Sequence, residues 1–582
     1  MRISQYAIEL AFTITTLALA AASVPQITVT DVADEDSNCH DIASSDACRS
    51  ATDLESGAEC VWCECAAVPS LCVTADEAKG LPAGVFNCDA TASRVASPVI
   101  SSQLAEDVAA RSTKNTADAA HGLRGAFGTA DAVDPKITSS RTYNFGARTV
   151  GHVGGEVDKS FCDADSSGKS YSGYVDLSGS AFDVDESKNY FYWFFESRSE
   201  DPSKDPLILW LTGGPGCSST LALLTENGPC SVNAEGTGTV PNPYSWTEHA
   251  NVIWLDQPAG VGYSYGTTND KNEEMVGEDA YYFLQTFFQQ YPQYAKMRLF
   301  IVGESYGGHY APAIAHRTWL GNKGLKDGLI HINLAGLGIG NGLTDPHIQY
   351  GYYAEMAYNN SHGIKTVSEA VYEEMKSATP LCLQMIQTCN NLKTDFVCQS
   401  AQTYCGAFIT SPYYASGLNP YDIRKECGDA ALCYDFSNVE KFLNLDSTRD
   451  ALHVTSESDS TWVTCNNDVN RQFAGDWMLD YAPFVADLAN DGIRVMIYAG
   501  DCDFICNYMG NKAWALDLEW NHKEEFNAED DKEFLDGGLV RVFQSFVFLQ
   551  VYEAGHMVPS DQPEFSLAMI KEFMKDDIEV FV

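Results

Sequence analysis

The stretch that decides the fold is Leu299-Phe-Ile-Val-Gly-Glu-Ser-Tyr-Gly-Gly-His309. Its apolar first part predicts a buried strand, which runs directly into the pattern G-x-S-x-G centred on Ser305. This pattern is typical of a sharp strand-to-helix turn that exposes a serine hydroxyl at the end of a sheet. Glycine suits positions 303 and 307 because side chains there would collide as the chain reverses. Ser305 is therefore a candidate nucleophile, which requires a base, an orienting acid and an oxyanion site elsewhere in the chain.

The five-residue pattern alone carries little weight. A chain of 582 residues with 45 glycines can contain one such pattern by chance. A glycine-rich turn with a solvent-facing serine explains the five residues equally well. The preceding strand, and segments farther along the chain, decide between the two interpretations.

Further apolar segments, separated by helical patterns, predict a sheet. The helical patterns are clearest over residues 278–291 and 310–319. The other candidates for buried strands span residues 190–195, 207–211, 252–255, 332–339, 495–498 and 546–552. Apolar strands that alternate with helices are typical of an α/β fold with a mostly parallel sheet and helices on both faces.

The region from residue 345 to residue 475 breaks this alternation. Six of its cysteines lie between Cys382 and Cys433. We expect a helical insertion, pinned by disulfides, that covers one end of the sheet. The domain that carries both the sheet and this insertion is expected to span residues 159–582.

The first 158 residues divide into three segments of different composition. Residues 1–22 combine an arginine, an apolar run and small residues, as in a secretory signal peptide. Residues 39–88 contain seven cysteines and few long apolar runs, so we expect disulfides in place of a large core. A zinc site at Cys60 and Cys63 would usually bring a second tight pair of ligands, and a secreted chain favours disulfides. Residues 89–158 are rich in Ala, Ser, Thr, Asp and Gly, which predicts a linker or a removable pro-segment.

The charge of the chain excludes several classes of partner. Lys+Arg number 36 and Asp+Glu number 80, so the formal net charge is −44. Such a chain repels nucleic acid and anionic membrane surfaces. After residue 22, no apolar run has the length of a membrane span, and we expect no membrane anchor. With 19 cysteines, the chain is expected to belong to the secretory pathway, in a vacuole or lysosome or outside the cell.

Two further polar residues follow predicted strands. Asp503 comes after the strand at residues 495–498, and His556 comes after the strand at residues 546–552. Each of the two alone is more often an ordinary turn residue. Together with Ser305, however, they stand in the order Ser, Asp, His, which is the order of the triad in α/β-hydrolases.

A set of motifs spread over the main domain gives a specific resemblance. The motifs are Trp210-Leu-Thr-Gly-Gly-Pro-Gly-Cys-Ser-Ser219, Asn242-Pro-Tyr-Ser-Trp246, Asp256-Gln-Pro258, Gly303-Glu-Ser-Tyr-Gly-Gly-His-Tyr310, Gly340-Asn-Gly-Leu-Thr-Asp345, Asp503-Phe-Ile-Cys-Asn-Tyr-Met-Gly-Asn-Lys-Ala-Trp514 and Gly555-His-Met-Val-Pro559. From about residue 160 onward, the chain resembles the serine carboxypeptidases of the α/β-hydrolase fold, such as carboxypeptidase Y and lysosomal cathepsin A. The resemblance implies an enzyme that releases C-terminal amino acids from peptides and proteins at acidic pH, with no metal and no cofactor.

The resemblance assigns a role to each loop residue. Ser305 would attack the carbonyl carbon, and His556 would take its proton and pass it to the leaving group. The aspartate that orients the histidine stands directly before Phe-Ile-Cys-Asn in the family, which favours Asp503 over its rival Asp501. Backbone N–H groups of Gly214 and Tyr306 would hold the oxyanion.

A carboxypeptidase must also hold the free carboxylate of its substrate. The family uses carboxyl groups for this purpose, and they match Glu304 and Glu226. Two acids facing a carboxylate bind it well only when protons are shared, which predicts an acidic optimum for peptides. Gly213 would add a backbone N–H, and Thr212 replaces an asparagine of the family pattern with a shorter donor. Met557 matches a residue that lines the pocket for the residue before the scissile bond.

The cysteines of the main domain fit the same resemblance. It implies the disulfides Cys217–Cys465, Cys382–Cys405, Cys389–Cys398 and Cys427–Cys433. Cys162 and Cys230 have no counterpart in carboxypeptidase Y, and we expect them to pair with each other. Cys506 matches a free thiol of the family, whereas Cys502 is additional, so a Cys502–Cys506 disulfide stays open as an alternative. Asn359 begins the only N-glycosylation sequon, Asn359-Asn-Ser361.

Two other functions stay open on sequence alone. An acyltransferase could use the same triad on small acyl esters, since a fold does not decide a function. The pair Glu226 and Glu304 favours the peptidase. A non-catalytic protective or binding protein is the second alternative, with residues 39–88 as its adhesive part, and the complete triad argues against this as the sole function.

Overall fold

The structure is a computed structural model, and it describes only part of the chain. The described residues are 152–575, except 165, 327, 431, 456–457 and 459–460, together with residues 48, 60–65, 71–74 and 86–88. The predicted signal peptide, residues 1–22, and the linker residues 89–151 lie outside them. The chain divides into two units, residues 1–96 and residues 97–582, and each is described by itself.

The first unit contains a small antiparallel sheet within the predicted cysteine-rich segment. Its strands are β1 (Cys60–Cys65), β2 (Leu71–Thr74) and β3 (Phe86–Cys88), in the order β2-β1-β3. Cys48 and Cys60 are buried, and both are disulfide-bonded. These two cysteines therefore form disulfides, as expected for a small secreted segment without a large core.

The second unit is built on an eleven-stranded mixed sheet, which confirms the predicted α/β fold. Its central strands run parallel to one another, and antiparallel strands extend it at both edges. In spatial order, the central strands are β10 (Asn251–Leu255), β7 (Leu207–Thr212), β11 (Leu299–Glu304), β12 (Leu334–Gly340), β15 (Arg494–Gly500) and β18 (Phe546–Val551). The edge strands are β6 (Asn189–Phe195), β5 (Ser170–Asp176) and β4 (His152–Val157) beyond β10, and β17 (Gly538–Phe543) and β16 (Lys532–Phe534) beyond β18.

The sheet begins earlier in the chain than predicted. Strand β4 lies within residues 89–158, whose composition predicts a linker, yet it pairs antiparallel with β5. Gly154 and Gly173 face each other across this pair, and a Cβ on Gly154 would meet the carbonyl oxygen of Ser172 at 2.3 Å. Backbone hydrogen bonds hold this edge strand where the backbones of β4 and β5 approach closely. Few apolar side chains therefore reveal it in the sequence.

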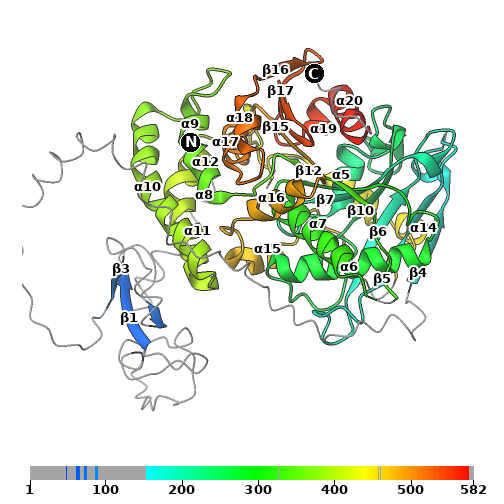
Figure 1. Cartoon of the computed structure of the whole chain (residues 1–582). Helices are drawn as coiled ribbons and strands as arrows, with labels where there is room; N and C mark the ends of the chain where they lie inside the picture. Colours follow the sequence, from blue (N-terminus) through cyan, green and yellow to red (C-terminus); the bar gives the residue numbers. More distant parts are fainter. Residues whose placement is uncertain are drawn as a thin grey trace, which may run out of the picture. The chain divides into compact units, whose positions relative to one another are not determined.

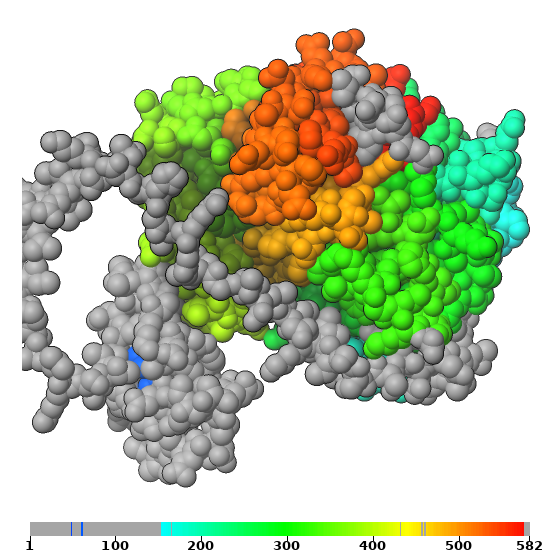
Figure 2. Space-filling model, viewed as in Figure 1, coloured from blue at the N-terminus to red at the C-terminus, as the bar shows by residue number. Residues whose placement is uncertain are grey.

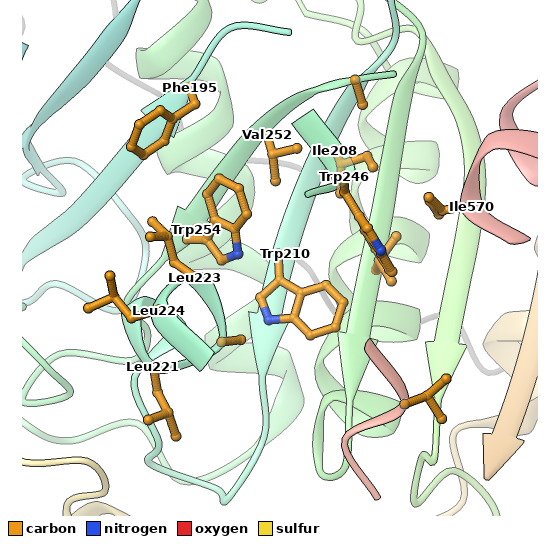
Figure 3. Close-up of a cluster of buried hydrophobic side chains, with 14 of the residues drawn as sticks. Phe195, Ile208, Trp210, Leu221, Leu223, Leu224, Trp246, Val252, Trp254 and Ile570 are labelled. Atoms are coloured by element: carbon orange, nitrogen blue, oxygen red, sulfur yellow. The ribbon is translucent and has the colours of Figure 1, made fainter. Parts of the chain in front are cut away.

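Side chains on one face of the central strands form a large aromatic cluster. Trp210 of β7 and Trp254 of β10 lie in it, beside the leucines of α5 (Ser219–Thr225), as Figure 3 shows. Trp246 packs edge-on against Trp210, with ring centroids 5.2 Å apart. Helix α20 (Pro563–Met574) closes the cluster with Ile570. Because large buried aromatic side chains dominate core energetics, this layer fixes the strands whose ends carry the site.

Helices cover the opposite face of the sheet as well. Phe300 and Val302 of β11 point into the aromatic cluster, whereas a Cβ on Gly303 would meet Ala311 of α7 at 3.0 Å. Helix α7 (Gly307–Lys323) packs between α6 (Glu273–Gln290) and α16 (Ala482–Asn490). The sheet therefore has helices on both faces, as the alternation of strands and helices predicts (Figure 1).

A mostly helical insertion separates β12 from β15, as predicted for residues 345–475. Helix α8 (Pro346–Gln349) contacts both α10 (Glu369–Leu392) and α17 (Tyr508–Asp517), so the insertion lies beside the segment that follows β15, as Figures 1 and 2 show. Its elements are α8 (Pro346–Gln349), α9 (Tyr353–Tyr358), α10 (Glu369–Leu392), α11 (Asp395–Cys405), α12 (Ser411–Tyr414), β13 (Leu418–Asn419), β14 (Asp422–Glu426), α13 (Ser437–Leu443), α14 (Asp446–Ala451) and α15 (Asn467–Gln472). The remaining short elements are β8 (Cys230–Val232), β9 (Thr239–Pro241), α18 (Lys523–Ala528) and α19 (Val558–Asp561).

All five predicted disulfides of this unit are present. They are Cys162–Cys230, Cys217–Cys465, Cys382–Cys405, Cys389–Cys398 and Cys427–Cys433. The last three lie within the insertion and pin it, because each closes a short loop there. Cys502 and Cys506 are both free and buried, so the alternative of a bridge between them does not hold.

Candidate active site

Ser305 lies at a tight turn between β11 and α7. Its φ is +64°, a left-handed conformation that residues other than glycine rarely adopt. A Cβ on Gly303 would meet the carbonyl oxygen of Gly307 at 2.4 Å, so this flank of the turn has no room for a side chain. The Ser305 N–H donates to the carbonyl oxygen of Gly340 at 3.2 Å, which anchors the turn to the end of β12. The serine stays partly exposed, as the G-x-S-x-G pattern predicts.

His556 and Asp503 meet at the ends of neighbouring strands. The two atoms His556 Nδ1 and Asp503 Oδ2 are 2.8 Å apart, and both side chains are buried. Asn341, in the loop after β12, donates from Nδ2 to the same carboxylate oxygen at 2.8 Å. The backbone N–H groups of Ile505 and Cys506 donate to Asp503 as well. These donors hold the carboxylate in position to orient the imidazole.

Asp501, the rival acid, is directed elsewhere. Its Oδ1 accepts a hydrogen bond from the Glu553 N–H at 3.0 Å. The same oxygen lies 2.9 Å from His362 Nε2. Of the two aspartates after β15, Asp503 is therefore the one that contacts His556.

Two backbone N–H groups next to Ser305 suit an oxyanion. Gly213 lies directly against the serine, because a Cβ there would meet Tyr306 N at 2.3 Å and Ser305 Cβ at 2.8 Å. In the part of the chain that the structure describes, the N–H groups of Gly214 and Tyr306 donate no hydrogen bond. Free donors beside a nucleophile are what a developing oxyanion requires.

The turn that contains Gly214 is fixed to the insertion. The disulfide Cys217–Cys465 joins the Gly214 turn to the insertion. A Cβ on Gly214 would meet the Cys217 Sγ at 2.8 Å. The Ser218 N–H donates to the carbonyl oxygen of Thr464 at 3.0 Å. The insertion therefore positions one of the two candidate oxyanion donors.

The other donor, Tyr306, is fixed through its side chain. Its hydroxyl donates to Asp476 Oδ2 at 2.6 Å, and the Tyr481 hydroxyl donates to Oδ1 of the same carboxylate at 2.7 Å. Burial raises the pKa of Asp476 to about 6. Asp476 thus ties the residue after the serine to the segment that leads back from the insertion to the sheet.

Glu226 and Glu304 form a buried carboxyl pair at the same end of the sheet. Burial raises the pKa of Glu226 to about 7. Burial first, and then the charge and hydrogen bond of Glu226, raise the pKa of Glu304 well above its ordinary value. The Oε2 atoms of both residues are buried and have no hydrogen-bond partner among the described residues. At acidic pH the pair is protonated, and it keeps hydrogen-bonding capacity for a ligand.

Thr212 pairs with Glu304 across the neighbouring strands β7 and β11. The Thr212 Oγ1 accepts a hydrogen bond from Trp210 Nε1 at 3.0 Å, which leaves the hydroxyl proton available for another acceptor. Met557 follows His556 directly and is partly exposed.

The buried acids make the stability of the protein depend on pH. In the folded protein Glu226 keeps its proton up to about pH 7, whereas its ordinary pKa is 4.5. Burial raises the pKa of Asp279 and of Asp480 to about 7 as well. The folded state therefore binds more protons than the unfolded state over this window, and the free energy of unfolding falls as the pH rises through it.

We expect the melting temperature to be several degrees higher at about pH 5 than at about pH 7.5. Differential scanning calorimetry of the purified protein in buffers of equal ionic strength measures this difference. A melting temperature that rises from the acidic to the neutral buffer would contradict the protonation of these buried acids.

Sequence reasoning missed two residues that position the site. Asn341 follows a buried strand next to β15 and lies in one of the quoted motifs, so its place in the sequence was a usable signal. Asp476 follows the insertion and belongs to no motif, so nothing in the sequence pairs it with Tyr306.

Comparisons with known proteins agree with the geometry. The family model described as serine carboxypeptidase matches residues 161–576. Carboxypeptidase Y of Komagataella phaffii is 42% identical over 416 residues, which cover 70% of this chain and 76% of that protein. Carboxypeptidase Y homolog A of Fusarium vanettenii is 44% identical over 406 residues, which cover 68% of this chain and 72% of that protein.

A solved structure is also similar to this chain. It is the prohormone-processing carboxypeptidase Kex1 of Saccharomyces cerevisiae, with a TM-score of 0.62 and 25% sequence identity. The match covers 72% of this chain and 95% of the other chain. The residues that the family model matches, 161–576, lie within the second unit, which contains the sheet and the insertion.

Proposed function

The chain belongs to the serine carboxypeptidase family and is a serine-type carboxypeptidase, and from this premise we propose that Ser305, His556 and Asp503 are its catalytic triad. One observation carries the assignment. The hydrogen bond between His556 Nδ1 and Asp503 Oδ2 is buried, and it lies at the strand ends next to the Ser305 turn. That bond leaves the other ring nitrogen, Nε2, free to face a serine hydroxyl.

The chemistry follows from these positions. His556 Nε2 takes the proton of Ser305 as Oγ attacks the carbonyl carbon of the last peptide bond, and the N–H groups of Gly214 and Tyr306 hold the oxyanion. The protonated imidazole then gives its proton to the departing amino acid, which leaves an acyl-enzyme. Water, activated by the same histidine, hydrolyses the ester and restores Ser305. Asp503 keeps the imidazole in the required tautomer and stabilises its charge.

The carboxyl pair explains why only the C-terminal peptide bond of a substrate is cleaved. Protonated Glu226 and Glu304 donate hydrogen bonds to the C-terminal carboxylate of the substrate, and their unpartnered Oε2 atoms support this role. The Gly213 N–H and the Thr212 hydroxyl add two neutral donors at the end of β7, the strand next to Glu304. Met557 lines the pocket for the residue before the scissile bond. An internal peptide bond has no such carboxylate to offer, so it is a poor substrate.

The activity is tested directly with an N-blocked dipeptide at about pH 5, where the buried acids are protonated. We expect release of the free C-terminal amino acid and of the blocked remainder. The same dipeptide with an amidated C-terminus measures what the carboxylate contributes, and we expect it to be cleaved much more slowly. Equal rates on the two substrates would contradict the carboxyl clamp.

The clamp also predicts how substrate binding depends on pH. Once Glu226 ionises, above about pH 7, the KM for a peptide with a free C-terminus is expected to rise about tenfold per pH unit, because like charges then face each other. The KM for an ester without a free carboxylate is expected to stay flat over the same range. Steady-state kinetics with both substrates from about pH 4 to pH 9 measure the difference.

A double variant, Glu226→Gln and Glu304→Gln, is the matched control for this pH dependence. Its amides donate hydrogen bonds at every pH, so the KM for the peptide should lose its rise above neutrality. A wild-type pH profile in the double variant would show that another group controls carboxylate binding.

An acyltransferase on the same triad is the alternative function. The protonated pair of Glu226 and Glu304 favours the peptidase, since an acyl ester has no carboxylate for it to hold. The protein can be incubated with an acyl ester and an alcohol acceptor. Acyl transfer to the alcohol, with no amino acid released from any peptide, would favour the acyltransferase over the peptidase.

The sequence and the disulfides support a secretory location. We infer a signal peptide at residues 1–22, a cysteine-rich module at residues 39–88, a linker or pro-segment before β4, and delivery to a vacuole, a lysosome or the cell exterior. Asn359, the predicted glycosylation site, is exposed at the end of α9. No helix in the described part of the chain is both long and apolar enough to cross a membrane.

A further inference from the structure

A second cluster of polar side chains lies on the far side of the loop that carries Asp503. His362 comes from the insertion, after α9, while Asp501 and Cys502 follow β15. His362 Nε2 lies 2.9 Å from Asp501 Oδ1 and 3.1 Å from Cys502 Sγ, and Sγ lies 3.4 Å from the same Oδ1. None of the three belongs to the triad, and Cys502 has no role in the reaction described above.

The arrangement is not that of a second catalytic relay. In a relay, the acid bonds to one imidazole nitrogen and the nucleophile to the other. Here the Asp501 carboxylate and the Cys502 thiol both face the same nitrogen, Nε2 of His362. Three donor atoms of different chemistry therefore converge on one point, as they do around a metal ion.

The donor set and its spacing suit zinc. Thiolate sulfur, imidazole nitrogen and carboxylate oxygen are the three ligand types of protein zinc sites. Zinc–ligand bonds of about 2.0 to 2.3 Å set tetrahedral ligand–ligand separations of about 3.4 to 3.6 Å. The observed separations are 2.9, 3.1 and 3.4 Å, so the side chains need to open by only a few tenths of an ångström.

The surroundings support the histidine as a ligand. Glu553 Oε1 lies 3.7 Å from His362 Nδ1, on the side where a carboxylate commonly orients a metal-bound imidazole. Asn360 holds the turn that carries His362, because its side chain donates to the carbonyl oxygens of Met356 and Ile364 and accepts from the His362 N–H. The His362 side chain is 17% exposed, which gives an ion a path from solvent to the buried thiol.

We propose that His362 Nε2, Asp501 Oδ1 and Cys502 Sγ bind one zinc ion, with a water molecule in the fourth position. Binding displaces the thiol proton to solvent, and the two negative ligands match the charge of the ion. The ion would join the insertion to the loop between β15 and Asp503. This site departs from the sequence-based expectation of no metal, and it does not depend on the triad assignment.

Metal binding by the full-length protein tests the proposal. The purified protein is treated with a chelator, dialysed and titrated with zinc chloride at about pH 7.5, where thiol and imidazole ligands lose their protons readily. We expect the wild-type protein to bind one zinc ion. The affinity for zinc should fall at least about 100-fold in Cys502→Ser and in His362→Gln. With cobalt(II) in place of zinc, the wild type should show thiolate-to-cobalt absorption, and Cys502→Ser should lose it.

Matched controls separate this site from other cysteines and histidines. Cys506→Ser removes the neighbouring free thiol, and His331→Gln removes an exposed histidine outside the cluster, and both should keep the wild-type affinity. Retained affinity in Cys502→Ser would overturn the proposal, as would the absence of zinc binding by the wild type. Loss of zinc binding in Cys506→Ser alone would show that the ion binds beside His556 and Asp503 instead. This result would also overturn the proposal. Circular dichroism checks that each variant is folded.

Discussion

Replacing Ser305 with alanine is expected to lower kcat for peptide hydrolysis about 10⁶-fold, because the acyl-enzyme can no longer form. The substitution removes only Oγ, and alanine keeps the turn between β11 and α7 free of new contacts. The strained φ of +64° is set by the flanking glycines and by the hydrogen bond to Gly340, and neither depends on the hydroxyl. Release of the free amino acid from an N-blocked dipeptide, followed by chromatography, measures the loss.

A serine near the site but outside it provides the control. Ser560 in α19 is exposed, and Ser560→Ala should keep the wild-type rate. A serine-directed phosphonate should label the wild type and Ser560→Ala at one residue, identified by mass spectrometry of the digested protein. Substantial peptidase activity in Ser305→Ala, or labelling of another serine, would mean that the nucleophile has been misassigned.

The second large effect is expected for Asp503→Asn, at about 10⁴-fold in kcat. An asparagine keeps the shape of the side chain, but its amide can present a donor to His556 Nδ1 and so favours the wrong tautomer of the ring. Asn341 donates to the Asp503 carboxylate at 2.8 Å. In the variant this hydrogen bond would go to a neutral amide and not to a charged carboxylate. Steady-state kinetics at a fixed acidic pH measure kcat and KM separately, and the loss should be confined to kcat.

Asp501→Asn is the comparison that decides between the two acids. Asp501 lies on the same loop and is equally buried, but it contacts His362 and the Glu553 N–H instead of His556. We expect its substitution to cost far less activity than that of Asp503. If the two variants lost activity in the opposite order, Asp501 would be the orienting acid, and the contact between His556 and Asp503 would have no catalytic role.

The parts of the fold that sequence reasoning predicted are those that bury apolar side chains. The central parallel strands are nearly continuous apolar runs because both of their faces are covered, so residues such as Trp210 and Val302 identify them. The loops after these strands meet at one edge of the sheet, and the contact between Asp503 and His556 lies there, as their places after two predicted strands indicate. The resemblance to a family supplied what spacing cannot, namely the disulfide partners and the carboxyl pair.

The parts that sequence reasoning missed depend on contacts between segments far apart in the chain. Strand β4 pairs through its backbone and carries glycines, so neither apolar periodicity nor composition separates it from a linker. His362 and Asp501 are 139 residues apart, and only the docking of the insertion brings them together. The same holds for Tyr306 and Asp476, whose hydrogen bond spans 170 residues. Local patterns carry no information about such pairs.

The bridge between Cys217 and Cys465 has a consequence for the order in which the enzyme is made. The two cysteines are separated by 248 residues, so the first emerges from the ribosome long before its partner exists. Until the second arrives, the turn that holds Gly214 lacks the segment against which it is fixed. A chain cut off before residue 465 would therefore contain the nucleophile without its finished surroundings. The bridge that fixes this turn can therefore close only after residue 465 has been synthesised.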